Sequence, residues 1–274
     1  MKQHYLAGIC LSAVLGFTSC TKHIYAPSAA NAPLLKEKNE FKASISPYNL
    51  HTAYAITNNV AVMANGQYVY QVNAGETNYP SDDLFVNGDL RGGMGELAVG
   101  FFKPLDRKKR MVFDVYAGGG MGGFKTLAAG ADQEGVNKED YRLKNRFSKI
   151  FIQPSIGFVH RAFEAGFTSR FSCVNFYDTH IGAHAFDNKE NAKSDFLRIA
   201  DKPTVFYEPT FTIRAGYKYV KFQSQLMFSV PIRDNNTLLN YPLNDYFQPV
   251  VFTMGVSVNI AHWYDNVIKE KKKY

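Results

Sequence analysis

A long apolar run is missing at the N-terminus. The mostly apolar stretch from Tyr5 to Phe17 has thirteen residues, whereas a helix needs about 20 to cross a bilayer. It follows the basic start Met1-Lys2 and precedes several small residues. This order is typical of a secretory signal peptide. We therefore predict a signal peptide over residues 1–19 rather than a transmembrane helix.

The end of this segment, Thr18-Ser19-Cys20, resembles the lipobox of bacterial lipoproteins, with Phe17 in place of the usual leucine. The resemblance implies a diacylated, palmitate-type modification of Cys20, cleavage before it and acylation of the new N-terminus. Each buried methylene adds ~0.8 kcal/mol, so several acyl chains form a firm anchor. The alternative is an ordinary signal peptide cut nearby, which leaves Cys20 as a free thiol.

Cysteine is scarce, with only Cys10, Cys20 and Cys173 among 274 residues. If Cys10 is removed and Cys20 is acylated, Cys173 alone remains, and a disulfide within the mature chain is excluded. The fold must then be stable without cross-links. A closed, fully hydrogen-bonded β-barrel meets that requirement.

No acidic run follows Cys20. In surface-exposed lipoproteins of the Bacteroidetes kind such a run resembles an export signal, so its absence favours lipid in the inner leaflet. Residues 20–39 are rich in Ala, Pro, Asn and Lys and show no apolar periodicity. We predict that they form a lipidated N-terminus and a periplasmic linker.

Apolar and less apolar residues alternate along much of the chain. From Val250 to Ile260, every second residue is apolar, a period that only a β-strand converts into two faces. The same pattern recurs along the chain and predicts about ten strands, with eight as the alternative. Their expected ranges are 40–47, 50–57, 60–72, 92–104, 110–125, 146–160, 162–177, 203–219, 221–233 and 247–263.

After the first hairpin, the connections between these strands alternate between tight turns and long polar segments. Short turns on the periplasmic side and long loops outside are typical of outer-membrane barrels. We therefore predict an all-β fold, a single antiparallel up-and-down transmembrane barrel over residues 40–263. An even strand count places both termini in the periplasm, with residues 264–274 as a basic periplasmic tail.

The less apolar face of the strands carries charged and amide residues. A charge that faces lipid costs ~2–4 kcal/mol at the bilayer midplane, so we expect these residues to face the lumen and to pair there. A barrel of this size has a narrow interior, which side chains would largely fill. The predicted interior charge network consists of Glu96, Asp114, Glu164, Arg170, Glu208 and Arg214.

A soluble, lipocalin-like barrel tethered by Cys20 is the main alternative fold. In that fold the apolar face would point inward and the charged face would meet water. The alternation of apolar and polar residues alone does not distinguish the soluble barrel from the membrane barrel. Aromatic residues gathered near strand ends and the asymmetry of the loops favour the membrane barrel.

Three phrases carry a family resemblance: YAPSAANAPLLKEKNEFKASIS after Cys20, FIQPSIGFVH at 151–160 and FYEPTFTIRAGYKYVKFQSQL at 206–226. They resemble a group of outer-membrane β-barrel lipoproteins of the Bacteroidetes kind, whose function is largely unassigned. The resemblance implies the fold and the location, and it carries no catalytic residues.

The best local candidate for chemistry is the segment from Asp178 to His184. His180 and His184 would share a face if a helical turn formed there, and Asp178 could complete a metal site. The glutamate of the zinc-protease motif HExxH is missing, which argues against zinc hydrolysis. We therefore predict no catalytic set, no metal and no cofactor besides the lipid on Cys20.

The sequence thus favours a non-enzymatic, lipid-anchored outer-membrane barrel that serves as a structural or accessory subunit. Expected partners are outer-membrane lipid and other outer-membrane or periplasmic proteins, and not nucleic acid. Two alternatives stay open. One is an outer-membrane enzyme acting on lipid or peptide at the extracellular rim, and the other is the tethered lipid-binding barrel.

Overall fold

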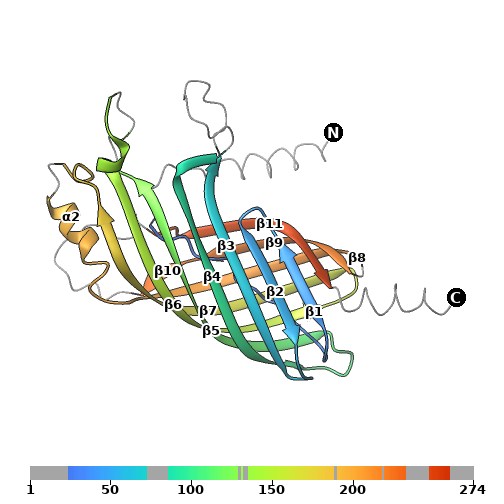
Figure 1. The fold of residues 1–274 in the computed structure, drawn as a ribbon. Helices are drawn as coiled ribbons and strands as arrows, with labels where there is room; N and C mark the ends of the chain where they lie inside the picture. Colours follow the sequence, from blue (N-terminus) through green and yellow to red (C-terminus); the bar gives the residue numbers. More distant parts are fainter. Residues whose placement is uncertain are drawn as a thin grey trace, which may run out of the picture.

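The computed structural model describes residues 24–72, 86–128, 131, 135–187, 190–217, 219–232 and 247–259, and the expected signal peptide, Cys20 and the basic tail lie outside them. One antiparallel sheet dominates the fold (Figure 1). Neither described helix is long and apolar enough to cross a membrane. The strands are β1 Phe41–Ile45, β2 Asn49–Ala55, β3 Val60–Val72, β4 Val86–Pro104, β5 Met111–Leu127, β6 Arg142–Val159, β7 Phe163–Ile181, β8 Thr204–Tyr217, β9 Val220–Phe228, β10 Val230–Ile232 and β11 Val250–Asn259, with helix α2 at Glu190–Leu197 and a 3-10 turn at Lys138–Tyr141.

The sheet closes on itself. Neighbouring strands pair in sequence order from β1 to β8, β1 pairs with β11, β11 with β9, and β9 with β8. Because β9 and β10 both pair with β8 and are separated only at Ser229, they form one interrupted strand. The expected ten-stranded closed barrel is therefore confirmed. Its strands are longer than expected on the loop side, since β4 begins at Val86 and β7 continues to Ile181.

The two faces of the sheet differ in chemistry. Along β6, exposed and buried residues alternate almost without exception. Ile150 is 67% exposed, whereas its neighbour Lys149 is 2% exposed. An apolar outer face around a charged interior is the arrangement of a transmembrane barrel and the reverse of a soluble one. The outer face includes Leu97, Val99, Met121, Ile152, Phe171, Phe211, Ile213, Phe222, Val230 and Met254.

A charge placed on this outer face tests the membrane arrangement. Ile152, half exposed on β6, lies toward the middle of its strand, whereas Phe163 begins β7 beside a short turn. Ile152→Arg should reduce the free energy of unfolding by ~2–4 kcal/mol, and Phe163→Arg by only ~0–1 kcal/mol. Urea titration in lipid vesicles, followed by the electrophoretic shift between folded and unfolded barrel, measures both. Equal, near-zero effects would contradict a lipid-facing surface.

The two ends of the barrel also differ. The short connections 56–59, 105–110 and 160–162 lie at one end, together with Tyr217 and Val220 of β8 and β9. At the other end, which we call the long-loop end, lie α2 and the ends of the strands that border the longer connections (Figure 1). Asp106 organises one short turn, because its Oδ1 accepts the backbone N–H groups of Met111 at 2.7 Å and Arg110 at 2.6 Å. These bonds hold the pKa of the Asp106 carboxyl below its ordinary value.

The N-terminal segment corrects the sequence analysis. Residues 24–35 form no periplasmic linker, because all of them are buried within the barrel. Tyr25 forms a bridge with Phe247 at the long-loop end, and Leu35 contacts a cluster that includes Ala55 and Phe102 beside the short turns. We call residues 24–35 the plug. Small Ala side chains and Pro residues without an N–H group suit a narrow lumen as well as they suit a linker, so composition did not distinguish the two.

The described ends of the chain consequently lie on opposite sides. Ile24 belongs to the long-loop end, whereas Asn259, the last described residue, pairs with Lys42 near the start of β1 at the short-turn end. The expectation of both termini on one side does not hold for these ends. The physical reason is that the plug adds one more crossing of the barrel beyond the ten strands.

Candidate functional site: the plugged lumen

Polar side chains of the barrel wall hold the backbone of the plug. The plug is irregular and makes few ladder hydrogen bonds, so its buried carbonyl groups need other donors. Side chains from seven wall residues supply them. Asn145 donates to the Ile24 carbonyl at 3.0 Å, Gln67 to Pro27 at 3.0 Å, Arg170 to Ser28, Gln225 to Ala30 at 2.7 Å, Gln153 to Asn31 at 2.7 Å, Arg214 to Ala32 at 2.8 Å and Lys42 to Leu34 at 3.4 Å.

The plug has fewer backbone N–H donors than carbonyl acceptors, because Pro27 and Pro33 have no N–H group. The N–H of Leu34 donates to Asp114 Oδ2 at 3.3 Å. Leu34 adopts a left-handed backbone, with φ of 48°, and its side chain fills the space beside Gly157, where a Cβ would lie 2.4 Å from Leu34 Cδ1. The plug therefore fits this lumen at specific points.

The first charged cluster lies on the long-loop side of the lumen. Arg170 Nε is 2.8 Å from Glu208 Oε2, and Arg170 Nη1 is 3.8 Å from Glu96 Oε2. Lys149 Nζ lies 3.1 Å from Glu96 Oε1 and 3.5 Å from Glu208 Oε2. Two carboxylates thus face two cations, all at least 98% buried. Paired in this way, buried charges avoid the large cost of isolated ones.

The plug is part of this cluster. The hydroxyl of Tyr25 donates to Glu208 Oε1 at 3.1 Å, and the hydroxyl of Ser28 donates to Glu96 Oε1 at 3.0 Å. Asn31 donates to Asn65 Oδ1 at 2.9 Å, and Asn65 in turn donates to Glu96. Charges of the wall and hydroxyl groups of the plug therefore form one connected network.

The second charged cluster lies nearer the short turns. Glu164 accepts contacts from Arg214 at 3.0 Å, Lys221 at 2.7 Å and Lys42 at 3.4 Å. One carboxylate thus serves three cations. The surplus positive charge is shared with oxygen acceptors, since Lys42 and Arg214 also contact plug carbonyls and Lys221 donates to the carbonyl of His160 at 2.6 Å.

The structure places all six residues of the expected network inside the barrel, in three separate places. Glu96, Arg170 and Glu208 share the first cluster, Glu164 and Arg214 share the second, and Asp114 binds the plug backbone. Sequence reasoning missed Lys42, Lys149 and Lys221. Their inward parity was available as a signal, because each is flanked by outward apolar or small neighbours in its strand.

An aromatic group covers the long-loop end of the lumen. The Tyr25 ring lies 4.9 Å from the ring of Phe206, 5.4 Å from Phe147, 6.1 Å from Phe176 and 6.4 Å from Phe247, measured between centroids. Buried residues of the connection after β7, including Phe196 of α2, join the same apolar cluster. We call this group the aromatic cap. It packs around Tyr25 at the start of the plug.

The histidine candidates do not converge. His180 lies on β7 opposite Lys144, so the helical turn on which the metal hypothesis depended is not formed there. Asp178 pairs with Arg146 at 3.3 Å, while His184 Nδ1 lies 3.0 Å from Asp187 on the surface. Within the described ranges, no group of three His, Cys, Asp or Glu side chains is placed to hold a metal ion.

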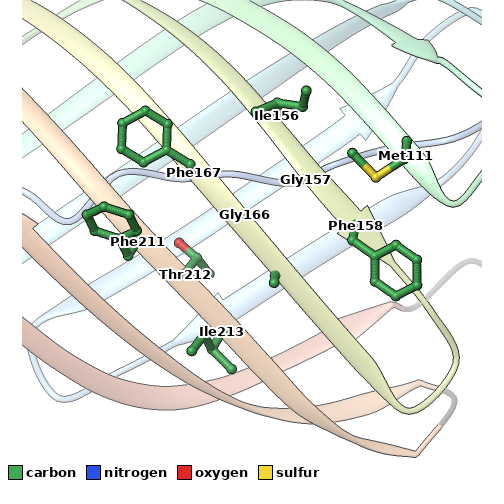
Figure 2. Close-up of a pocket in the computed structure, with 10 residues that line it drawn as sticks. Met111, Ile156, Gly157, Phe158, Gly166, Phe167, Phe211, Thr212 and Ile213 are labelled. Carbon is green, nitrogen blue, oxygen red and sulfur yellow. The ribbon is translucent and has the colours of Figure 1, made fainter.

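A shallow hollow of about 450 Å³ lies on the outer surface. Figure 2 shows Phe158, Phe167, Phe211, Ile156, Ile213 and Met111 around it, with the pale N-terminal trace passing behind β6 and β7. Its lining includes the small residues Gly157, Ala165 and Gly166, and nearly all of the lining is apolar. It lies on the lipid-facing side and offers no polar group suited to catalysis.

Comparisons with known proteins add a fold likeness only. No protein-family model matches the chain, and no curated protein matches it. One similar solved structure is the outer membrane protease OmpT from Escherichia coli, with a TM-score of 0.37 and 10% identity, covering 80% of this chain and 92% of that one. Nothing about activity follows from so distant a likeness. By its own geometry, the chain is an outer-membrane-type β-barrel of ten antiparallel strands, closed around its own N-terminal segment.

Proposed function

We propose that this protein is a non-enzymatic, lipid-anchored barrel of the outer membrane that acts as a structural or accessory subunit and does not conduct. The observation that carries the proposal is the occupied lumen. A twelve-residue plug, from Ile24 to Leu35, fills the interior along its length, and wall side chains bind its backbone at seven points.

The interior charges have a structural role under this proposal. In an open pore, lumen charges meet water and passing ions. Here the side chains of Arg170, Glu208 and Lys149 have no exposed area and are engaged with one another and with the plug. Groups held in this way stabilise a closed barrel.

The rim supplies no support for the enzyme alternative. A general base needs a nucleophile or substrate proton within hydrogen-bond reach and a group that orients it. His184 and Asp187 form an exposed pair, and no third catalytic group joins them in the part of the chain that the structure describes. We therefore assign the long-loop end to contacts with partner proteins.

Conductance measurements test the closed lumen. Wild-type protein inserted in planar bilayers should give no unitary steps, because the plug blocks the path. A variant lacking residues 24–35 should give steps if it folds, and it serves as the positive control. Steps from the wild-type protein, at voltages that leave a matched empty bilayer silent, would contradict the closed barrel. This outcome does not depend on whether the deletion variant folds.

Complex size tests the subunit role. Protein extracted in mild detergent from its own membranes should migrate above the size of the barrel alone. Lys193→Glu with Leu197→Ser, which changes the exposed side of α2 and keeps the buried Phe196, should reduce that larger species if the long-loop end makes the contact. Migration as a lone barrel under several mild detergents would overturn the accessory-subunit proposal.

A further inference from the structure

The plug has a direction. Its first residues, Ile24 and Tyr25, lie in the aromatic cap at the long-loop end. Its last residue, Leu35, lies with Ala55 and Ala61 beside the β2–β3 turn, and Lys38 donates its N–H to Asn58 in that turn at 3.2 Å. The chain therefore enters the lumen from the long-loop face, crosses the barrel and then begins β1 at the short-turn end.

Chain length limits how far Cys20 can lie from Ile24. Three residues, 21–23, stand between them, so four Cα–Cα steps join the two and a fully extended chain spans at most about 14 Å. The apolar band of a membrane barrel is about 25 Å tall. A return from Ile24 to the short-turn face would have to cross that band. The available chain is too short by roughly half.

The route back through the lumen is also closed. Beneath Ile24, the rings of Tyr25, Phe147 and Phe206 are fully buried against one another. Below them, Arg170 and Lys149 lie between the two carboxylates of the first cluster. A second stretch of polypeptide, or an acyl chain, would have to displace these buried rings and break these ion pairs.

We propose that the mature N-terminus, with the acyl chains expected on Cys20, lies on the long-loop side of the membrane, opposite the C-terminal end of the barrel. The proposal rests on the membrane barrel proposed above. If the short turns face the periplasm, the lipid lies in the outer leaflet at the cell surface. This reverses the inner-leaflet expectation drawn from the missing acidic run.

Site-directed labelling tests the placement. In a Cys173→Ser background, single cysteines are introduced as His23→Cys beside the plug, Lys202→Cys in the long connection after β7, and Arg107→Cys in the β4–β5 turn. Each variant is exposed to a membrane-impermeant maleimide in intact cells and again after the outer membrane is permeabilised. His23→Cys should label in intact cells, together with Lys202→Cys, while Arg107→Cys should label only after permeabilisation.

The outcomes separate the proposals. If His23→Cys labelled only after permeabilisation, as expected for Arg107→Cys, or did not label under either condition, the proposed position of the N-terminus on the long-loop side would be wrong. Intact mass spectrometry of the wild-type protein and of Cys20→Ala tests the lipid, and a wild-type mass without acyl groups would overturn that part. Conductance by the wild-type barrel would instead contradict the proposed non-conducting structural role. The labelling result, which tests the position of the N-terminus, would not change.

Discussion

Arg170→Met should destabilise the barrel more than almost any other single substitution, lowering the free energy of unfolding by ~3–5 kcal/mol. The guanidinium is fully buried and contacts Glu208, Glu96 and the plug carbonyl of Ser28. Its removal leaves two buried carboxylates with Lys149 as their remaining cation. A methionine fills similar volume but supplies no donor, so the loss is electrostatic and not one of packing.

Urea titration in lipid vesicles measures this effect, again with the electrophoretic shift of the folded barrel as the readout. The matched control is Arg146→Met on the neighbouring strand. Arg146 pairs with Asp178, but both side chains are more than half exposed, and such pairs contribute only ~0–1 kcal/mol. If the two variants lost similar stability, the first cluster would not hold the plug to the wall as the structure indicates.

Glu164→Gln should lower the free energy of unfolding by a similar ~3–5 kcal/mol, here because a buried carboxylate is removed from its cations. Glu164 is the carboxylate that contacts Lys42, Arg214 and Lys221 together. The amide keeps the shape but removes the charge, so three cations remain side by side in the second cluster. The plug carbonyls of Ala32 and Leu34 then face an unbalanced group.

The control for this prediction is Glu37→Gln, because Glu37 pairs with Lys109 at 2.9 Å on the surface, with both side chains over two-fifths exposed. It should change stability by ~0–1 kcal/mol. A double variant, Glu164→Gln with Lys221→Met, should recover part of the loss, since residues in one network are coupled. No recovery, or a neutral Glu164→Gln, would show that the second cluster does not depend on its carboxylate.

The interior charge set illustrates what parity predicts and what it leaves open. Parity assigned Glu96 and Arg170 to one face of their strands, because a period of two leaves no other arrangement. It did not assign them to the same cluster. Strand register and barrel closure bring Glu96 of β4 near Arg170 of β7, and two strands lie between them in the sheet.

The histidine segment illustrates an error of boundary. The expected strand ended at 177, which left His180 in a loop free to form a helical turn. In the structure β7 continues to Ile181, paired with β6 through a register shift near Arg146. Local sequence did not indicate this extension, because the pairing of β6 supplies the hydrogen bonds that keep the strand going.

By itself, the sequence determined an antiparallel barrel of about ten strands with two chemically different faces, because the alternation sets the faces and the connections set the ends. It left a soluble barrel with the apolar face inward as an alternative, and the structure decided between the two by placing the apolar residues outside. Only the tertiary structure decided what fills the barrel. An Ala- and Pro-rich segment has the same composition in water as in a narrow lumen, and its carbonyl partners, such as Gln225 and Arg214, are nearly two hundred residues away. No local pattern records contacts over that distance, and those contacts set the side on which the chain begins.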